Sequence, residues 1–507
     1  MKSKSLVIFL VVIARASGWS LFKASREHSA KALLKTLKKG RSTFDEHVKV
    51  VSVGRNECGI QLEGPESTST DVVYVDRDEF LTPAMGQATS VGQAVEKYFE
   101  NHQEDTEMHK NLLPSIYMAL YLCLCRYGDE VNNRFSSYVA TLPSLKELRH
   151  LPVFWTNDAL AELQGSTVLD GIETRKEFWI AEHQLVQNAL DEAGLKAGYK
   201  YIDEETWFWA RAIICSRAFT DEYTDSPCLV PYVDMMNHMT ENDQQTGHLK
   251  CSWDIDSTGY HLQLPKDTPP HHTTSNNRLG ISYGSCSNGA FLMNYGFSIF
   301  DDESQIQHEN AVLSIKLPQA FSLAGATSIW EADGLGDCHE VSRNVRVSIG
   351  EAGPMESVLS MCRVASAQNE AELSKMQGNF RTEAMRTPDT ADGLVPQLGA
   401  TLCRSPFSES NEILALRMLE RILLDSLRRY STTLDRDNLL LTSKRISSDH
   451  RNAILVRRGE KQVILHFEIL ISLALRFLEN KDGDFDTYKG MLEASLGNGR
   501  PLINTII

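Results

Sequence analysis

The order of patterns along the chain is the feature that most constrains its fold. β-Branched runs such as 48–53 and 72–75 are followed by a long stretch, 88–220, in which apolar residues recur at helical spacing. Short strands and loops return at 228–300, and helical patterns dominate 355–494. This order predicts an α+β fold: a small β-fold with a helical insert at about 88–220, followed by an all-helical C-terminal domain.

Three local signals refine the prediction for the C-terminal half. Residues 311–317 form a strand-like run, and the Gly/Ser/Thr/Pro-rich segments 320–350 and 380–405 predict long loops. Ser408 is placed to cap the start of a helix. The apolar stripe that follows it indicates the buried face of that helix, and consists of Ile413, Leu416, Leu419, Leu423 and Leu427.

Length and composition bound the class of protein. The chain has 507 residues, which predicts two or three domains. Its 42% hydrophobic and 23% charged residues are typical of a globular chain, and exclude collagen, a disulfide miniprotein and a largely disordered protein. The net charge of −16 gives no overall electrostatic footprint for nucleic acid, so we expect no nucleic-acid partner.

The ten cysteines are scattered and include no C-x-x-C pair. The closest two, Cys123 and Cys125, lie inside the apolar run 116–125, where small core residues are the simpler interpretation than metal ligands. We therefore expect reduced thiols and no metal.

The amino terminus has the pattern of a targeting signal. Lys2 and Lys4 precede nine apolar residues at 6–14, and small residues suited to cleavage follow, which predicts a signal peptide at 1–18. Nine apolar residues are too few to span a bilayer, so we expect no stable membrane insertion.

Residues 19–43 contain seven basic residues and one acidic residue, and make 19–45 a candidate transit peptide. A signal peptide followed by a transit peptide resembles the bipartite import signal of plastids bounded by extra membranes. The chain has no N-x-[ST] acceptor, which favours an organelle interior such as the plastid stroma. The alternatives are the secretory pathway or the cytoplasm, with 19–43 as a solvated basic helix.

Two clusters of polar and aromatic residues carry the functional signal. The first contains Ser216-Arg217 and a Pro-x-x-Asp-x-x-Asn-His segment at 231–238, whose Asn237 lies twenty residues after Arg217. The second contains Ser282-Tyr283-Gly284, Ser287-Asn288 and Tyr295-Gly296-Phe297, with twelve residues between the two tyrosines. Taken singly, each motif has an ordinary structural explanation. Their order and spacing together do not.

In that order, the motifs resemble the SET-domain protein methyltransferases, in the branch of the Rubisco large-subunit lysine methyltransferases and the actin-histidine methyltransferase. The segments 429–437 and 451–461 resemble the Rubisco LSMT-type substrate-binding domain of that branch. The resemblance covers roughly 46–480. It implies a SET domain at 46–303, whose pseudoknot brings Asn237, His238 and Tyr283 together, and a helical substrate-binding domain at 304–495.

The resemblance implies methyl transfer from S-adenosyl-L-methionine to a nitrogen of a protein. Tyr283 matches the catalytic tyrosine of the family, and no metal is required. Two further groups of residues match family positions. The cofactor-binding residues are Gly59, Ile60, Arg217, Asn237 and His238, with Arg217 expected to contact the cofactor's carboxylate. The substrate-binding residues are Ser216, Phe219, Asp234 and Tyr295.

Two positions favour lysine over histidine as the target. The actin-histidine branch carries Asn where this chain has Phe219 and Trp where it has Val233, and a phenyl ring at 219 suits the aliphatic stem of lysine. For a plastid protein, the resemblance implies an abundant substrate such as the Rubisco large subunit or an aldolase. We expect a monomer. A protein-histidine methyltransferase is the alternative enzyme.

The chain also departs from the family pattern. The opening Gly-x-Gly of the cofactor loop is here Glu57-Cys58-Gly59, and the usual Gly-Glu turn before the Tyr-Gly strand is absent from 275–280. The segment 239–280 is longer than usual. These departures leave a second hypothesis, a catalytically degenerate SET scaffold that acts as a protein-binding module.

Overall fold

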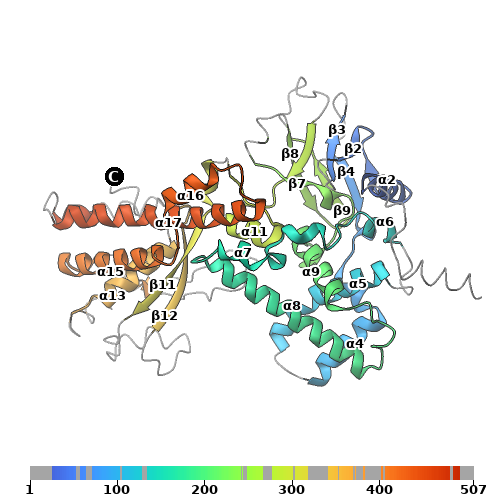
Figure 1. Cartoon of the computed structure of the whole chain (residues 1–507), viewed down its shortest axis with the longest axis horizontal. Coiled ribbons are helices and arrows are strands. Elements are labelled where there is room, and N and C mark those ends of the chain that lie inside the picture. Colours follow the sequence, from blue (N-terminus) through green and yellow to red (C-terminus); the bar gives the residue numbers. More distant parts are fainter. Residues whose placement is uncertain are drawn as a thin grey trace, which may run out of the picture. The chain divides into compact units, whose positions relative to one another are not determined.

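A computed structural model describes residues 26–52, 58–63, 71–102, 106–127, 134–240, 243, 248–265, 277–300, 303–317, 341–351, 353–368, 372, 381–382, 401–402, 406–479 and 484–490. The chain divides into two compact units (Figure 1). Unit 1 comprises Met1–Arg149 and Thr174–Gly284, and unit 2 comprises His150–Glu173 and Ser285–Ile507. The predicted signal peptide at 1–18 lies outside the described residues.

Unit 1 is built on an eight-stranded sheet in the order β1-β4-β9-β8-β10-β3-β2, with β7 paired to β10 beside this path. A separate hairpin pairs β5 with β6. The strands are β1 (Thr43–Phe44), β2 (Val48–Ser52), β3 (Cys58–Leu62), β4 (Asp71–Asp76), β5 (Phe219–Asp221), β6 (Ser226–Cys228), β7 (Asn237–His238), β8 (Leu249–Ile255), β9 (Gly259–Gln263) and β10 (Asn277–Ile281).

The alternation of residues along β4 and β9 gives this part of the sheet one apolar and one polar face. Val75 pairs with Tyr260 and Val73 with Leu262, and all four side chains are buried. On the opposite face Tyr74 pairs with His261. The apolar face therefore belongs to the core of unit 1.

The described part of the candidate transit peptide is folded. Helix α2 (Arg26–Leu37) buries Ala30, Leu33 and Leu37, which recur at helical spacing, and it packs against β2 and α6. Strand β1 follows and pairs with β4. The candidate transit peptide at 19–45 stays a prediction, and its described part is an element of unit 1.

The helical insert is the larger part of the rest of unit 1. Its helices are α3 (Pro83–Gln87), α4 (Ser90–His102), α5 (Thr106–Tyr127), α6 (Ser136–Val139), the C-terminal part of α8 (Thr167–Glu192) and α9 (Glu204–Arg217). Asp203 caps α9 by accepting from the Thr206 N–H at 2.8 Å. In α9 the Trp209 indole donates to the Pro143 carbonyl at 2.7 Å. These contacts fix the helix that ends at Ser216 and Arg217.

Unit 2 is mainly helical, with strands beside the helices. Helices α13, α15 and α17 and strands β11 and β12 share one core, in which Leu416, Leu419 and Leu423 belong to the same cluster as Val463 and Phe467. Ser408 caps α15 by accepting from the Asn411 N–H at 3.2 Å, as predicted. The elements are α7 (Asn157–Ala161), α11 (Asn288–Tyr295), β11 (Asn310–Leu317), β12 (Val341–Ser348), α13 (Gly353–Ala365), β13 (Arg381–Thr382), β14 (Thr401–Leu402), α15 (Glu409–Leu427), α16 (Leu434–Leu441) and α17 (Ser448–Glu479).

Two elements of unit 2 differ from the predictions. Residues 341–348 form β12, antiparallel to β11, although 320–350 was predicted as a loop. The buried Val345 and Val347 alternate there with more exposed residues, which is a strand pattern. Residues 288–295 form α11 within a region predicted as strands and loops, because Ser287 caps that helix. Among the described residues, no helix combines the length and the apolar character needed to cross a membrane.

Candidate functional site

Strand β7 brings the two predicted clusters together. It pairs in parallel with β10, with Asn237 opposite Gly280 and His238 opposite Ile281. The backbone N–H of Tyr283 donates to Nδ1 of His238 at 3.1 Å, and the two rings lie 5.4 Å apart. Because Nδ1 accepts this bond, the ring proton of the neutral imidazole is on Nε2. The structure thus brings Asn237, His238 and Tyr283 together, which is the juxtaposition that the predicted pseudoknot requires.

The close pairing of β7 and β10 depends on Gly280. A Cβ atom at this position would lie 2.7 Å from the Asn237 carbonyl oxygen and 2.6 Å from Cγ of Met239. Neither distance is compatible with an ordinary side chain. Only glycine therefore allows the Asn237–His238 strand to approach β10 this closely.

The predicted cofactor-binding residues of β3 lie along the same edge of β10. Residues 277–279 pair with β3, and residues 280–281 pair with β7. The opposite edge of β10 is occupied by β8 at 279–281. Strands β3 and β7 therefore follow one another along one edge. Ile60 is fully buried and pairs with Val50 of β2 and Leu279 of β10. The predicted backbone contacts of Gly59 and Ile60 with a cofactor stay a prediction.

Tyr283 follows β10, and its phenol points to a carbonyl. The hydroxyl donates to the backbone oxygen of Met236 at 2.6 Å. Burial raises the pKa of Tyr283 to about 12, an effect that Arg217 opposes and Asp234 reinforces. The phenol is therefore neutral near pH 7, where it acts as a hydrogen-bonding group rather than as a phenolate base.

Asp234 is held by two donors deep in unit 1. It lies in the short 3-10 helix Val233–Met235, and its side chain is fully buried. Arg217 uses Nη1 to donate to the Asp234 backbone oxygen at 2.9 Å and to Oδ2 at 3.3 Å. The phenol of Tyr138 donates to the same Oδ2 at 2.9 Å. The other carboxylate oxygen, Oδ1, is buried and accepts no bond from any described residue.

These contacts bear on two predicted roles. Arg217 is predicted to bind the carboxylate of the cofactor, and here its Nη1 donates to Asp234. Burial raises the pKa of Asp234, and the adjacent Arg217 guanidinium and the Tyr138 phenol oppose that rise. The predicted roles of Arg217 at the cofactor and of Asp234 at the substrate stay predictions.

Ser216 and Phe219 lie at and just after the C-terminal end of α9. The Ser216 hydroxyl donates back to the Ala212 carbonyl at 2.8 Å, while its own carbonyl is among the last of the helix and has no partner within it. The Phe219 ring lies edge-on to Trp253 and to Tyr260, at 5.3 Å from each. An apolar aromatic wall therefore begins three residues after Ser216.

Tyr295 belongs to unit 2, where it ends α11. Its ring lies 6.1 Å from that of Phe297. Gly296 adopts a left-handed conformation with φ of 76°, and a Cβ there would lie 2.8 Å from the His150 carbonyl oxygen. This residue thus terminates the helix, for a structural reason that only glycine satisfies. The predicted role of Tyr295 in binding the target side chain stays a prediction.

Two other motif residues have structural roles in unit 2. The Asn288 side chain accepts from the Ile299 N–H at 2.6 Å and donates to the Ile299 carbonyl at 3.1 Å. Ser287 caps α11. Both residues fix the loop after α11.

Of the departures from the family pattern, Glu57 and residues 266–276 lie outside the described residues.

Sequence reasoning missed three side chains that surround the site. Tyr138 holds Asp234, while Trp253 and Tyr260 stack at 5.8 Å and contact Phe219. Trp253 and Tyr260 belong to neighbouring strands, β8 and β9, and the alternation along those strands was the available signal. No periodic signal indicated that Tyr138 lies beside Asp234.

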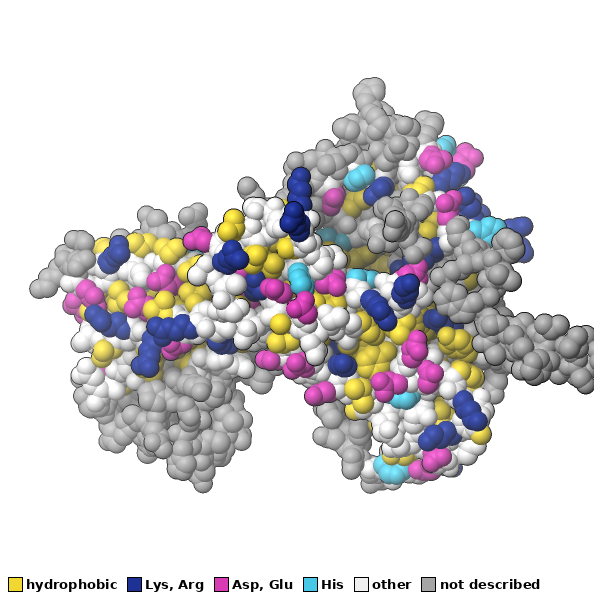
Figure 2. Space-filling model, in the orientation of Figure 1, with side chains coloured by type: hydrophobic (Ala, Val, Ile, Leu, Met, Phe, Trp, Pro, Cys, Tyr) yellow, Lys and Arg dark blue, Asp and Glu magenta, His cyan; other side chains and the backbone are white. Residues whose placement is uncertain are grey.

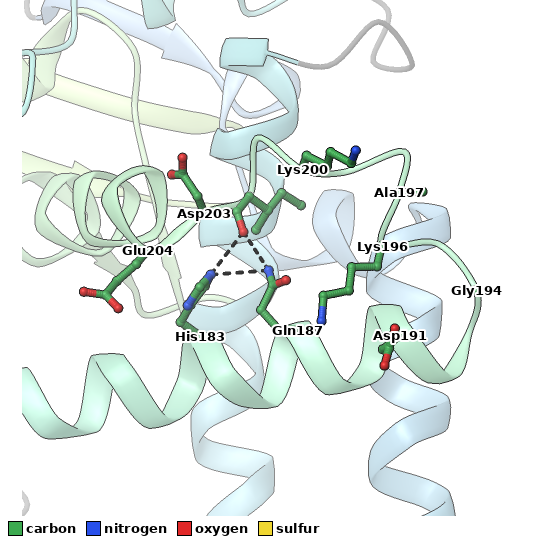
Figure 3. Close-up of a pocket in the computed structure, with 10 residues that line it drawn as sticks. His183, Gln187, Asp191, Gly194, Lys196, Ala197, Lys200, Asp203 and Glu204 are labelled. Carbon is green, nitrogen blue, oxygen red and sulfur yellow. Dashed lines mark hydrogen bonds between the residues drawn. The ribbon is translucent and has the colours of Figure 1, made fainter.

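A separate pocket of about 660 Å³ opens between the C-terminal part of α8 and the loop leading to α9 (Figure 3). The His183 and Gln187 side chains both contact the Ile202 carbonyl, at 3.1 and 2.7 Å. None of the predicted site residues lines this pocket. Its lining consists of His183, Gln187, Asp191, Gly194, Lys196, Ala197, Lys200, Ile202, Asp203 and Glu204.

Charged side chains of both signs are interspersed over the described residues on the face shown in Figure 2. Lysines and arginines there lie next to aspartates and glutamates along the helices of both units, rather than gathering by sign.

Comparison with known proteins identifies relatives of both halves of the chain. Residues 327–464 match the family model for Rubisco LSMT substrate-binding. The chain is 24% identical over 362 residues to the ribulose-1,5-bisphosphate carboxylase/oxygenase large subunit N-methyltransferase of Nicotiana tabacum, covering 70% of this chain and 66% of that protein. It is also 24% identical over 359 residues to the [fructose-bisphosphate aldolase]-lysine N-methyltransferase of Arabidopsis thaliana, covering 70% and 67%.

A third relative is the actin-histidine N-methyltransferase of Papio anubis, 22% identical over 411 residues, covering 77% of this chain and 62% of that protein. The chain therefore matches about two thirds of the length of these curated relatives. Among solved structures, the SET domain of LSMT bound to lysine and AdoHcy superposes with a TM-score of 0.62 and 17% identity, covering 89% of this chain and 93% of that one.

The fold is that of the SET-domain protein methyltransferases, so the predicted fold class is confirmed. In sequence the chain is similar to the Rubisco large-subunit and actin-histidine methyltransferases, and residues 327–464 match the Rubisco LSMT substrate-binding model.

Proposed function

We propose that this chain is an S-adenosylmethionine-dependent protein-lysine N-methyltransferase. The observation that carries the proposal is the parallel pairing of β7 with β10, which joins Asn237 and His238 to Tyr283. Three residues that the resemblance assigns to cofactor binding and catalysis thereby lie at one place, although 45 positions separate His238 from Tyr283.

The residues along this edge fit the groups of S-adenosylmethionine. Arg217 keeps guanidinium nitrogens for a carboxylate, which suits the methionine end of the cofactor. Asn237 is exposed, and its amide both donates and accepts, while the Nδ1 atom of His238 accepts from the backbone N–H of Tyr283. In the proposed site these residues and the backbone of Gly59 and Ile60 hold the cofactor.

When bound, the cofactor supplies a methyl group on a positively charged sulfur. The lone pair of the target nitrogen forms a bond to that methyl group, and the electrons of the broken S–C bond stay on sulfur. The nitrogen then releases a proton to water. The chain contributes position and a dry environment. In the proposed site the neutral Tyr283 phenol and the Ser216 and Met236 carbonyls orient the target nitrogen. The buried surroundings favour the neutral amine over the ammonium ion.

We prefer lysine as the target because other aromatic rings pack around Phe219. Phe219, Trp253 and Tyr260 form an aromatic cluster, in which Phe219 itself offers no hydrogen bond to an imidazole. Such a cluster suits an aliphatic stem and an alkylammonium group. Val233 is buried and adds an apolar side chain.

The test is transfer of isotope-labelled methyl groups from S-adenosylmethionine to three purified proteins: Rubisco, fructose-bisphosphate aldolase and actin. We expect labelling of Rubisco or aldolase on lysine, identified by mass spectrometry, and loss of labelling in Tyr283→Phe. Label on a histidine would identify the alternative enzyme. The matched control is Tyr117→Phe, which removes a buried hydroxyl in α5 outside the site.

A second function, a non-catalytic SET scaffold, is favoured by the sequence Glu57-Cys58-Gly59, which lacks one glycine of the cofactor loop. Calorimetry with S-adenosylmethionine separates the two functions. Binding in the micromolar range supports the enzyme. A chain that folds, binds no cofactor and labels none of the three proteins is the scaffold.

We further propose a plastid location, with processing before Arg26, which would shorten the candidate transit peptide from 19–45 to 19–25. The packed helix α2 and the strand β1 support this boundary, because removing residues up to 45 would expose the apolar residues that α2 covers. Fusion of residues 1–25 to a fluorescent protein tests the import signal. Terminal sequencing of the imported full chain then tests the boundary, and a mature terminus after Arg26 contradicts it.

A further inference from the structure

Tyr138 lies beside Asp234 and is not part of the sequence motifs. It lies in the four-residue helix α6, is 1% exposed, and donates to Oδ2 of Asp234 at 2.9 Å across 96 positions of sequence. Burial, reinforced by the negative charge of Asp234, raises the pKa of Tyr138 far above its ordinary value. The phenol therefore keeps its proton and remains a donor.

The donors to Asp234 are arranged asymmetrically. Tyr138 and Arg217 both donate to Oδ2, whereas Oδ1 is buried and accepts from no described residue. A buried carboxylate oxygen without a donor is costly, and such an atom calls for an explanation such as a catalytic role or a bound water or ion. Two donors on Oδ2 also hold the carboxylate in one orientation, so Oδ1 is fixed in place before any ligand binds.

Oδ1 of Asp234 and the carbonyl that accepts from the Tyr283 phenol belong to the same short segment of the chain. Asp234 lies two residues before Met236, whose carbonyl accepts from the Tyr283 phenol, and Asp234 and Tyr283 interact electrostatically. A donor that reaches Oδ1 is therefore close to the group assigned to catalysis. An amine nitrogen bearing hydrogen is such a donor.

We propose that Tyr138 is a positioning residue of the methyl-transfer site, which holds the Asp234 carboxylate so that Oδ1 accepts a hydrogen bond from the target nitrogen. This inference rests on the proposed function. It adds a residue from the helical insert to a site otherwise assembled from the sheet and the end of α9.

The test compares Tyr138→Phe, Asp234→Asn and the double variant with the wild type in the methyl-transfer assay. Loss of a hydrogen bond to a charged group predicts a kcat about 10- to 100-fold lower in Tyr138→Phe, with a raised KM for the protein and a Kd for S-adenosylmethionine within about twofold. If Tyr138 acts through Asp234, the double variant loses no more than Asp234→Asn alone.

The matched control is Tyr117→Phe. Tyr117 is a buried tyrosine of unit 1 whose hydroxyl has no partner among the described residues. A purely structural role for Tyr138 would lower the melting temperature and leave kcat of the folded enzyme unchanged, as in Tyr117→Phe. An unchanged kcat in Tyr138→Phe overturns the proposal. Weaker cofactor binding with unchanged kcat in Asp234→Asn also overturns it, because Oδ1 would then serve the cofactor.

A binding measurement separates failure of this inference from failure of the proposed function. Calorimetry of free lysine in the presence of S-adenosylhomocysteine requires no turnover. We expect at least about tenfold weaker lysine binding in Tyr138→Phe than in Tyr117→Phe. If the wild type binds lysine but labels none of the three proteins, the assigned substrates are refuted. The comparison of lysine binding between Tyr138→Phe and Tyr117→Phe remains valid in that case. Equal lysine binding in the two variants refutes the role of Tyr138.

Discussion

Two buried networks, one in each unit, contain the same three groups, an arginine, a carboxylate and a tyrosine phenol. In unit 2, Arg363 donates to both oxygens of Glu412, at 2.6 and 2.7 Å, and Tyr488 adds a bond of 2.8 Å to Oε1. In unit 1, the equivalent donors are Arg217 and Tyr138, and both act on one oxygen of Asp234.

The two networks differ in how many of the carboxylate oxygens have a donor. Both oxygens of Glu412 have donors, so its network is closed and supports the packing of α13 against α15. Asp234 retains one buried oxygen without a donor among the described residues. A closed network stabilises a fold, whereas an open one holds an acceptor ready for a ligand, at a cost in stability.

The largest expected effect comes from breaking the closed network. Arg363→Ala leaves the buried carboxylate of Glu412 without its counter-ion. We expect a loss of about 3–5 kcal/mol in the free energy of unfolding, measured by urea denaturation. A loss below about 1 kcal/mol would show that the network does not support unit 2.

A third buried carboxylate, Glu460, has hydroxyl donors: Ser166 at 2.7 Å and Tyr430 at 3.0 Å. Burial raises its pKa from 4.5 to about 7. The folded state then binds a proton more tightly than the unfolded state, so the associated stabilisation is complete below pH 4.5 and is lost as pH rises through 7. The shift corresponds to about 3 kcal/mol.

Unfolding free energies at pH 5 and pH 8 measure this effect. Burial also raises the pKa of Glu309 to about 7, so Glu460→Gln should remove part of the decrease with pH rather than all of it. A stability that rises between pH 5 and pH 8 would contradict the prediction, as would a slope that Glu460→Gln leaves unchanged.

The phenols of Tyr488 and Tyr138 allow a direct comparison of the two networks. Tyr488→Phe and Tyr138→Phe each remove one donor to a buried carboxylate, and we expect each to cost about 1–2 kcal/mol of stability. Only Tyr138→Phe should lower methyl transfer. Thermal unfolding and the transfer assay on the same two variants provide the measurement, and equal losses of transfer would remove the distinction between the networks.

The smallest effect is expected from an exposed pair with the same charges. Nη2 of Arg417 lies 2.6 Å from Oε1 of Glu479, and the Arg417 side chain is 60% exposed. Arg417→Ala should cost less than about 1 kcal/mol, because water and salt screen the interaction. The cost should fall further in 1 M salt. A cost comparable to that of Arg363→Ala would mean that burial does not set the strength of these pairs.

Local patterns predicted most of the secondary structure and its order. Helical spacing indicated the insert and α15, Ser408 was correctly placed as a cap, and β-branched runs indicated β2 and β4. The same reasoning passed over the alternation in β12 and the Ser287 cap of α11. Those two errors were errors of interpretation, since the signals are present in the sequence.

The predicted site divides into residues that the structure brings together and residues with structural roles. Asn237, His238 and Tyr283 meet as the resemblance implied. Gly296 terminates a helix and Asn288 clamps a loop, so these motif positions are explained by local geometry. The departure at Glu57 lies outside the described residues, and its effect on cofactor binding is left to the calorimetric test.

The sequence by itself determined which elements form and which chemical groups are present, because periodicity, capping and turn preferences act within a few residues. Tertiary structure alone decided which donor meets which acceptor. Tyr138 and Asp234 are 96 positions apart, and a hydrogen bond across that distance leaves no periodic trace in the chain. Whether Oδ1 of Asp234 has a donor depends on the packing of α6, α9 and the 233–235 turn, and that packing distinguishes a closed ion pair from a candidate site.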